Sequence, residues 1–166
     1  MYWYRKCFDL QLQGQDEQSK VLEIGSGTSP LKHIYPLVKT SDILPVPELD
    51  YCLDVMEIDQ FTELEDHSLD LIVMTNVLHH LKEPLEVLKK LNVKLKKGGE
   101  VVFVEPYFSM LSSFIYRFHH EPFDMNIKEA KLSTEEGPLT SSNQALPFLI
   151  FFRNKAWRGA VEENYQ

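Results

Sequence analysis

The feature that most constrains the fold is an alternation of strand-like with helix-like segments between Val21 and Pro106. This alternation is typical of a parallel, doubly wound sheet, so the sequence predicts a Rossmann-like, mostly parallel α/β fold. The fourth strand-like segment is almost wholly apolar, as expected of a strand covered on both faces. The five expected strands are VLEIG at 21–25, KTSDI at 39–43, YCLDV at 51–55, LDLIVMTN at 69–76 and EVVFVEP at 100–106.

The clearest helix is predicted over residues 83–99, EPLEVLKKLNVKLKKGG. Leucines recur there every three to four residues, and Pro84 suits a first helical turn. Lysines crowd the far end, where Gly98 and Gly99 are expected to stop the helix. After Pro106 the pattern weakens. We expect a helix over 107–120, a polar loop or lid over 128–144, and a late strand at ALPFLIFF, 145–152.

The first strand runs into a glycine turn, VLEIGSGTSP at 21–30. Gly25 and Gly27 let the backbone turn sharply and approach a ligand closely. Ligands of open parallel sheets bind beyond the carboxyl ends of the strands, which makes this turn the default site. Pro30 stands where a dinucleotide fingerprint requires its third glycine, and no Gly-Lys-Ser/Thr follows. A ligand without phosphates therefore fits better than a dinucleotide, although a plain strand-to-helix turn is the alternative.

Polar side chains follow the next three strands. Asp42 ends the second strand, where a carboxylate can accept hydrogen bonds from both hydroxyls of a ribose. Asp54 ends the third strand, within reach of an adenine amino group, and Asn76 ends the fourth. A nucleoside with a charged amino-acid tail would satisfy this set. The alternatives are a cap or turn role for Asp42 and an ordinary strand-exit role for Asp54. Glu105, near the end of the fifth expected strand, either faces the site or lies at its rim.

Composition narrows the class of partner. The formal net charge of −8 argues against a general nucleic-acid-binding surface. The two cysteines, Cys7 and Cys52, form no disulfide framework, and the first residues lack the apolar run of a signal peptide. A cytoplasmic location is therefore expected. No apolar run approaches the roughly 18 residues of a membrane span.

The segments VLEIGSG, TSDI, LDV, LDLIVMTNVLHHL and LKKGGEVVFVEP occur in the order and spacing of a class I S-adenosylmethionine-dependent methyltransferase. The chain resembles in particular the small methyltransferases grouped as type 11, over residues 21–106. The segments YRFHHEPFD and GPLTSSNQALPFLIF also resemble the tail of a subgroup often found beside glycan and lipid biosynthesis genes.

This resemblance implies S-adenosyl-L-methionine as cofactor and S-adenosyl-L-homocysteine as product. The glycine turn would face the methionine end, Asp42 the ribose, Asp54 the adenine, and Asn76 the sulfonium side. Ser29 departs from the fuller Glu-x-Gly-x-Gly-x-Gly form of the family's turn. The cofactor-binding residues so implied are Glu23, Gly25, Ser26, Gly27, Asp42, Ile43, Asp54, Val55, Asn76 and Val77.

Two histidine clusters are candidates for a general base, because a histidine titrates near neutral pH. The candidates are His79, His80, His119, His120 and Glu121. Packing or hydrogen bonding under the loop is the alternative for the first pair, and a helix-end cluster without a catalytic role is the alternative for the second. Adjacent side chains are expected to point in different directions, and no Cys/His ligand spacing occurs. No metal site is therefore predicted.

The resemblance implies methyl transfer to a small-molecule, glycan or lipid-precursor acceptor. A non-catalytic or truncated cofactor-binding module acting as an interaction partner is the alternative. We expect a single domain over 1–166, with a cofactor-binding core at 21–106 and a variable acceptor or lid region at 107–166. Methyltransferase sheets usually finish with an antiparallel strand pair, of which one strand candidate is present here. We therefore expect an incomplete sheet and a homodimer that covers its edge.

Overall fold

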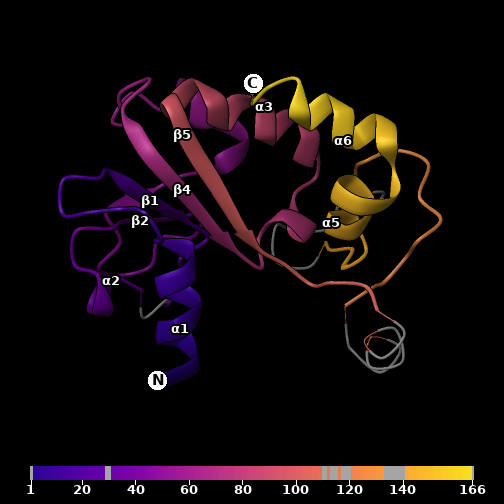
Figure 1. Cartoon of the computed structure of the whole chain (residues 1–166), viewed down its shortest axis with the longest axis horizontal. Coiled ribbons are helices and arrows are strands. Elements are labelled where there is room, and N and C mark those ends of the chain that lie inside the picture. Colours follow the sequence, from indigo (N-terminus) through magenta and orange to yellow (C-terminus); the bar gives the residue numbers. More distant parts are fainter. Residues whose placement is uncertain are drawn as a thin grey trace. The chain divides into compact units, whose positions relative to one another are not determined.

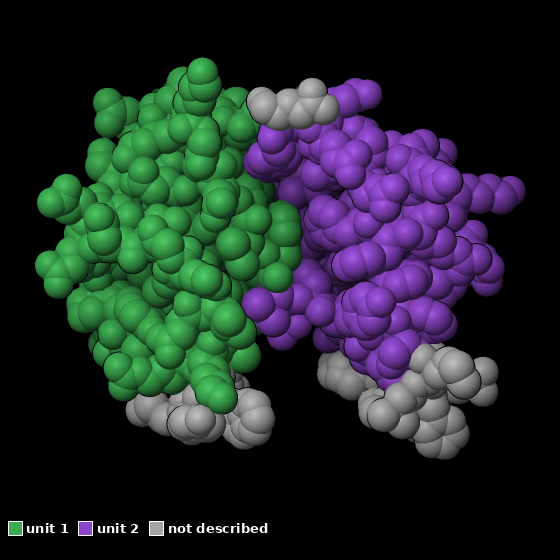
Figure 2. Space-filling model, viewed as in Figure 1, with its two compact units in different colours: residues 1–75, 90–103 green, residues 76–89, 104–166 purple. Residues whose placement is uncertain are grey.

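The structure is a computed structural model that describes residues 2–28, 31–109, 112, 116, 121–132 and 141–165. The chain divides into two compact units (Figure 2). Unit 1 comprises residues 1–75 and 90–103, and unit 2 comprises residues 76–89 and 104–166. The turn residues Ser29 and Pro30 lie outside the described part, as do His119 and His120.

Unit 1 contains a five-stranded sheet with strand order β3-β2-β1-β4-β5 (Figure 1). The pairs β1–β2, β1–β4 and β2–β3 are parallel, with Glu23 opposite both Thr40 and Val73. The predicted Rossmann-like, mostly parallel α/β fold is thereby confirmed. Since β1 has β2 on one side and β4 on the other, the strand order reverses at its carboxyl end. The strands are β1 (Val21–Ile24), β2 (Lys39–Asp42), β3 (Tyr51–Cys52), β4 (Leu69–Thr75) and β5 (Leu95–Val104).

The apolar runs form strands because both faces of the central sheet are covered. All four residues of β1 are buried, and so are most of those of β4. On one face, helices α1 (Tyr2–Gln11) and α2 (Leu31–Ile34) contribute to a core with the strands. Helix α1 had no counterpart among the expected elements. The buried members of this core are Phe8, Val21, Leu31, Val38, Leu71 and Val73.

The predicted helix at 83–99 is present but shorter. Helix α3 spans Pro84–Lys94, and β5 begins at Leu95. The expectation that Gly98 and Gly99 stop the helix is therefore wrong, because both lie inside β5. A Cβ atom at Gly99 would lie 2.9 Å from the Leu69 carbonyl oxygen of β4. Gly99 therefore lets the β5 backbone approach β4 closely, which is a different role from the helix stop expected from the sequence.

Unit 2 is largely helical or irregular. After the 3₁₀ turn η2 (Leu78–His80), its C-terminal part contains α5 (Leu146–Phe148), the π-helical turn η3 (Leu149–Arg153) and α6 (Lys155–Glu162). The Asn154 side chain caps α6 by accepting hydrogen bonds from the backbone N–H groups of Ala156 and Trp157. The buried core of this unit is formed by Leu132, Leu146 and Ile150.

The late strand expected at 145–152 is wrong, because this run is helical. A short apolar run suits a buried strand and a buried helix equally, so periodicity alone does not separate them. Leu146, Leu149 and Ile150, spaced three and four apart, are all buried, as on one helical face. Most of the helix expected at 107–120 lies outside the described residues, as does 133–140 of the expected loop.

The last four residues of that expected loop are not exposed to solvent. Residues 141–144 are buried, at 3 to 9% exposure, although all four are polar. No helix among the described residues is long and apolar enough to cross a membrane.

Candidate functional site

The glycine turn after β1 has the backbone that the sequence predicts. Gly25 and Gly27 adopt φ angles of 70° and 49°, which side chains of L-residues rarely adopt. Between them, Ser26 is buried and donates its backbone N–H to the Ser41 carbonyl, N···O 2.9 Å. The Ser41 hydroxyl in turn donates to the Glu23 carbonyl at 2.9 Å. These bonds fix the turn to the carboxyl end of β2.

Asp42 organises the same turn with its carboxylate. Oδ2 accepts the Gly27 N–H at 2.8 Å, and Oδ1 accepts the Leu44 N–H at 2.9 Å. The residue is 9% exposed. The turn role that the sequence left open as an alternative is thus present. A carboxylate has about four lone-pair positions, so two accepted bonds leave room for ligand hydroxyls. Its neighbour Ile43 is 37% exposed beside it.

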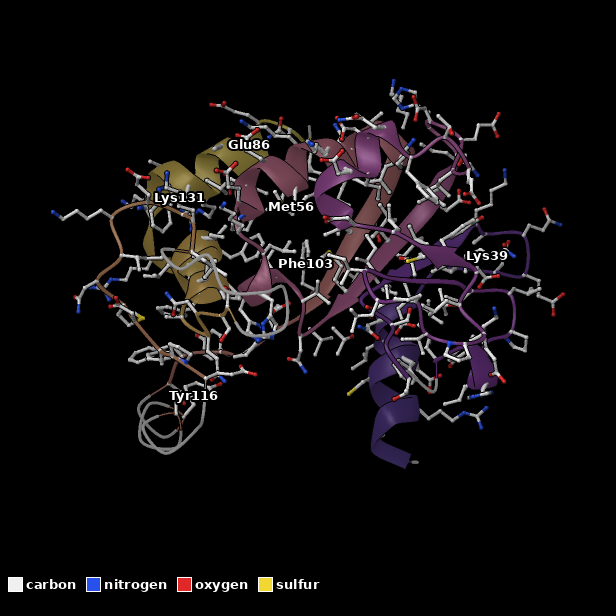
Figure 3. The ribbon with its side chains drawn as sticks, turned by 180° about the vertical axis from the view of Figure 1, so that it is seen from behind. Lys39, Met56, Glu86, Phe103, Tyr116 and Lys131 are labelled. Atoms are coloured by element: carbon white, nitrogen blue, oxygen red, sulfur yellow. The ribbon has the colours of Figure 1, made fainter. Side chains whose placement is uncertain are left out.

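Asp54 lies at the carboxyl end of the adjacent strand. The backbone N–H of Leu53 donates to the Asp42 carbonyl at 2.8 Å, which holds the two strand ends together. The Asp54 side chain caps the 3₁₀ helix η1 (Val55–Gln60) by accepting the N–H of Met56, labelled in Figure 3, at 2.9 Å. Asp54 is exposed, whereas Val55 is buried.

Unit 1 has a hollow of about 160 Å³ beside the glycine turn. Ser26, Gly27 and Thr40 line it together with residues of the β2–β3 connection, and Glu23 is buried at 3% exposure in the strand below. Cofactor and drug-sized sites usually measure about 300–1,000 Å³, so this hollow accommodates part of such a ligand. A larger hollow of about 450 Å³ includes Val21 and Val38, at the amino ends of β1 and β2, away from the turn.

The two remaining cofactor candidates, Asn76 and Val77, belong to unit 2. Asn76 directly follows β4 and adopts a left-handed φ of 56°, a conformation in which asparagine is enriched. Its backbone N–H donates to the Val104 carbonyl at 2.8 Å. This bond secures the start of the turn that leads into η2.

Glu105 has a central position that sequence reasoning left undecided. Its Oε1 accepts the N–H groups of Val77 and Leu78 at 2.8 and 2.7 Å, and its Oε2 lies 2.6 Å from His79 Nδ1. The side chain is 6% exposed. The carboxylate thus satisfies the free N–H groups at the start of η2 and orients His79. A carboxylate directly after the last strand was the only sequence signal for this role.

His79 and His80 do not point in different directions, and that expectation is wrong. Their ring centroids are 4.2 Å apart, and both Nε2 atoms face Glu121. The distances are 3.4 Å from His79 Nε2 to Oε2 and 3.9 Å from His80 Nε2 to Oε1. Successive residues of a 3₁₀ turn are rotated by about 120°, so it is the shared partner Glu121, not the local backbone repeat, that brings the two rings together.

Buried polar residues of segment 141–144 hold this cluster from the other side. The Ser141 carbonyl lies 3.0 Å from His80 Nδ1, and Gln144 Nε2 donates to Glu121 Oε2 at 2.7 Å. The Asn143 N–H donates to the His79 carbonyl at 2.9 Å. Three segments far apart in the sequence therefore meet at one group of ionisable side chains, all within unit 2.

The sheet order defines an open α/β protein, and the glycine turn lies at the switch point of its strands, where folds of this class bind their ligands. Residues 4–163 match the family model described as a methyltransferase domain. The chain belongs to this family of methyltransferase domains. No curated protein gives a significant match to the sequence.

Solved structures share the fold at low sequence identity. A SAM-dependent methyltransferase from Thermotoga maritima is 15% identical, with a TM-score of 0.55 over 97% of this chain and 70% of its own. The methyltransferase domain of the citrinin polyketide synthase is 16% identical, with a TM-score of 0.50 over 71% and 38%. The methyltransferase CalH, solved with SAH, is 22% identical, with a TM-score of 0.47 over 60% and 35%. The chain thus spans little more than a third of the length of the last two.

Proposed function

We propose that this chain binds S-adenosyl-L-methionine and transfers its methyl group to a small-molecule, glycan or lipid-precursor acceptor, leaving S-adenosyl-L-homocysteine. Membership of the methyltransferase domain family supports the reaction class. The observation that carries the proposal is the bond from the Gly27 N–H to Asp42 Oδ2, 2.8 Å. It joins a glycine turn and a carboxylate at the carboxyl ends of neighbouring parallel strands.

The residues of unit 1 fit this cofactor. The two left-handed glycines carry no side chains and Ser26 between them is buried, so the backbone of the turn is open to the polar methionine end of a ligand. Asp42 keeps lone pairs for ribose hydroxyls, and exposed Ile43 offers an apolar surface next to it. In this proposal Glu23 and Ser26 support the turn, Asp54 and Val55 border the adenine, and Asn76 and Val77 line the sulfonium side.

The cofactor supplies a methyl group activated by a positively charged sulfur, and the protein has to place an acceptor in line with it. The chain contributes binding and alignment, which account for much of the rate of a reaction of this kind. The backbone of the turn and Asp42 restrict the position of the donor. A base is required only for an acceptor that has to lose a proton early, such as a hydroxyl.

The base candidates differ in accessibility. His79 is 2% exposed and His80 is 23% exposed, so His80 is the more accessible of the pair to an acceptor. Glu121, at 21%, is accessible to a similar degree. A base role for any of these three residues stays a prediction, as it does for His119 and His120, which lie outside the described residues.

An aromatic group in unit 2 supports an acceptor with apolar or ring-shaped parts. The Tyr107 ring lies 5.5 Å from that of Phe148 and 5.4 Å from that of Phe152, in edge-to-face geometry. Tyr107 and Phe152 are 55% and 61% exposed. Tyr116, labelled in Figure 3, stacks on Phe123 with ring centroids 5.1 Å apart. Exposed aromatic groups of this kind are typical of ligand or partner surfaces.

Calorimetric titration with S-adenosylhomocysteine, with NAD in parallel, tests the cofactor. We expect binding of S-adenosylhomocysteine alone. Asp42→Asn should weaken it by about 10- to 100-fold, because a hydrogen bond to a charged group contributes about 1.5–3 kcal/mol. Glu57→Gln, an exposed carboxylate in η1, is the control and should bind normally. Absence of binding by the folded wild-type chain, or full binding by Asp42→Asn, would contradict the proposal.

An assay for transfer of a labelled methyl group distinguishes an active methyltransferase from a non-catalytic cofactor-binding module. Acceptor mixtures of sugars and lipid-linked glycans are incubated with labelled S-adenosylmethionine, and the products are separated from the cofactor. If an acceptor becomes labelled with the wild-type chain and not with Asp42→Asn, the result supports the methyltransferase activity. Cofactor binding without transfer to any acceptor class would favour the alternative, a cofactor-binding module that acts as an interaction partner.

A further inference from the structure

We propose that His79, His80 and Glu121 form a binding site for a divalent transition-metal ion, with Zn²⁺ as the best fit. One potential ligand atom from each of these residues lies within 4.8 Å of those of the other two. All three belong to unit 2, so the site does not depend on how the two units are placed. The proposal concerns metal binding and is independent of methyl transfer.

The hydrogen bonds of the cluster fix which ring nitrogen of each histidine is available. His80 Nδ1 lies 3.0 Å from the Ser141 carbonyl, which can only accept, so this nitrogen carries the proton. His79 Nδ1 lies 2.6 Å from Glu105 Oε2, on a carboxylate that already accepts two backbone N–H groups. With Nδ1 as the donor in each ring, Nε2 is the nitrogen that both rings direct toward Glu121 and that is available to a metal ion.

Lone pairs that face a carboxylate repel it unless a positive charge lies between them. A proton on Nε2 would give a charge-assisted hydrogen bond of about 2.7–2.9 Å. The observed Nε2–oxygen distances are longer, 3.4 Å for His79 and 3.9 Å for His80. Ligand atoms at about 2.0–2.2 Å from a tetrahedral Zn²⁺ ion are about 3.3–3.6 Å apart. The 3.4 Å distance at His79 lies in this range, whereas His80 Nε2, 3.9 Å from the other carboxylate oxygen, has to move closer to reach a shared metal ion.

The surroundings have the form that supports metal ligands. A histidine that binds a metal through one nitrogen usually donates the other N–H to a carboxylate or a backbone carbonyl. Glu105 has that place behind His79, and the Ser141 carbonyl has it behind His80. Gln144 orients Glu121 with a hydrogen bond of 2.7 Å. His79 is buried at 2% exposure, whereas His80 and Glu121, at 23% and 21%, leave the site open to an ion from solvent.

The ligand types select among metals. Two imidazoles and one carboxylate suit zinc and its transition-metal neighbours, whereas magnesium and calcium prefer oxygen ligands. Three protein ligands leave a fourth tetrahedral position, which water or a substrate group occupies in catalytic zinc sites. The two carboxylates of the cluster, Glu105 and Glu121, also balance the two charges of the ion.

The test is calorimetric titration of the full chain, freed of metal by a chelator, with Zn²⁺ and in parallel with Mg²⁺. We expect one Zn²⁺ per chain and no Mg²⁺. His80→Ala and Glu121→Gln should each weaken Zn²⁺ binding by more than about 100-fold, since loss of a supporting residue alone costs about 10- to 100-fold. The matched controls His33→Ala and Glu86→Gln remove exposed residues outside the cluster and should leave the affinity unchanged.

Two further measurements keep the test decisive if a variant unfolds. Glu105→Gln keeps the shape of the supporting side chain and should weaken Zn²⁺ binding by about 10- to 100-fold. Co²⁺ in place of Zn²⁺ should give the visible absorption of a tetrahedral site, which the folded Glu121→Gln variant loses. The proposal is overturned if the wild-type chain binds no Zn²⁺, or if folded His80→Ala and Glu121→Gln bind it like the wild type.

Discussion

At the scale of single residues, Asp50 shows how a carboxylate is stabilised in this chain. Its side chain is 14% exposed and contacts Lys32 Nζ at 2.6 Å and Lys39 Nζ, labelled in Figure 3, at 3.0 Å. Oδ2 also accepts the Thr40 N–H at 2.9 Å. Burial by itself raises the pKa of Asp50, but the hydrogen bonds from Lys32, Thr40 and Lys39 outweigh it and hold the pKa below its usual range.

Asp50→Asn should lower the free energy of unfolding by about 1–3 kcal/mol at pH 7, because two charge-assisted bonds are lost. The pKa of Asp50 in the folded protein lies below its value of about 3.9 in the unfolded chain. The ionised Asp50 therefore contributes its full stabilisation above about pH 5. This contribution disappears as the pH falls through the folded pKa. Urea unfolding of both proteins at pH 7 and pH 3 measures the difference, which should narrow in acid. A difference that widens in acid would contradict the expectation.

At the scale of elements, two glycines have opposite functions. Gly99 lies in β5, where an added Cβ would meet the Leu69 carbonyl oxygen at 2.9 Å and the Lys96 carbonyl oxygen at 3.1 Å. Gly159 lies inside α6, where no atom lies within 4 Å of an added Cβ. The first glycine is required by close packing of two strands, whereas the second only weakens its helix.

Gly99→Ala should therefore destabilise the protein by about 1–3 kcal/mol, since β5 has to move away from β4. Gly159→Ala should stabilise it by about 0.5–1 kcal/mol, the difference in helix propensity between the two residues. Thermal unfolding of both variants beside the wild type checks the two signs. If both substitutions changed the unfolding temperature equally, the close contact between β5 and β4 at Gly99 would not be the reason for a glycine at that position.

At the scale of the whole molecule, self-association stays a prediction. Among the described strands, β5 is at one edge of the sheet, and its last residue, Val104, is 37% exposed. An uncovered edge strand is a template for pairing with another chain, and a lysine on such an edge discourages it.

We expect the wild-type chain to sediment as a dimer and Val104→Lys to shift it toward the monomer. The control is Leu37→Lys, an exposed leucine between α2 and β2, at 63% exposure, which should stay dimeric. Sedimentation over a range of protein concentrations measures both. A wild-type monomer at the highest concentration would rule out the homodimer.

Much of unit 1 was predictable because its signals are local. Five short strand-like segments, four of them rich in apolar residues, predicted the strands of the parallel sheet. Gly25 and Gly27 predicted the sharp turn after β1, since few other residues adopt positive φ. The position of Asp42 at a strand end predicted that it lies near this turn, as the 2.8 Å bond to Gly27 shows. Whether Asp42 also binds a ribose stays a prediction.

Lys94 illustrates what local signals miss. It reads as one of several lysines at a helix end, yet it is 2% exposed. Its ammonium donates to the Phe61 and Leu64 carbonyls at 3.0 and 2.9 Å and to Asp66 at 2.5 Å. No periodicity indicates these partners, because they lie about 30 residues away in a loop. The helical state of residues 145–152 was missed for the same reason, since packing on Leu132 and its neighbours selects it.

The amino-acid sequence by itself determined the parallel sheet, the glycine turn and the methyltransferase family, because periodicity, backbone freedom and motif spacing are properties of adjacent residues. Only the tertiary structure brought His79 and His80 to Glu105, Glu121 and Ser141. His79 and its partner Glu105 are 26 positions apart in the sequence, and His80 and its partner Ser141 are 61 positions apart. Such contacts depend on how the chain returns to η2 from later segments. Buried hydrogen bonds hold these later segments against η2, and they join residues far apart in the sequence. No single stretch of sequence therefore predicts the contacts.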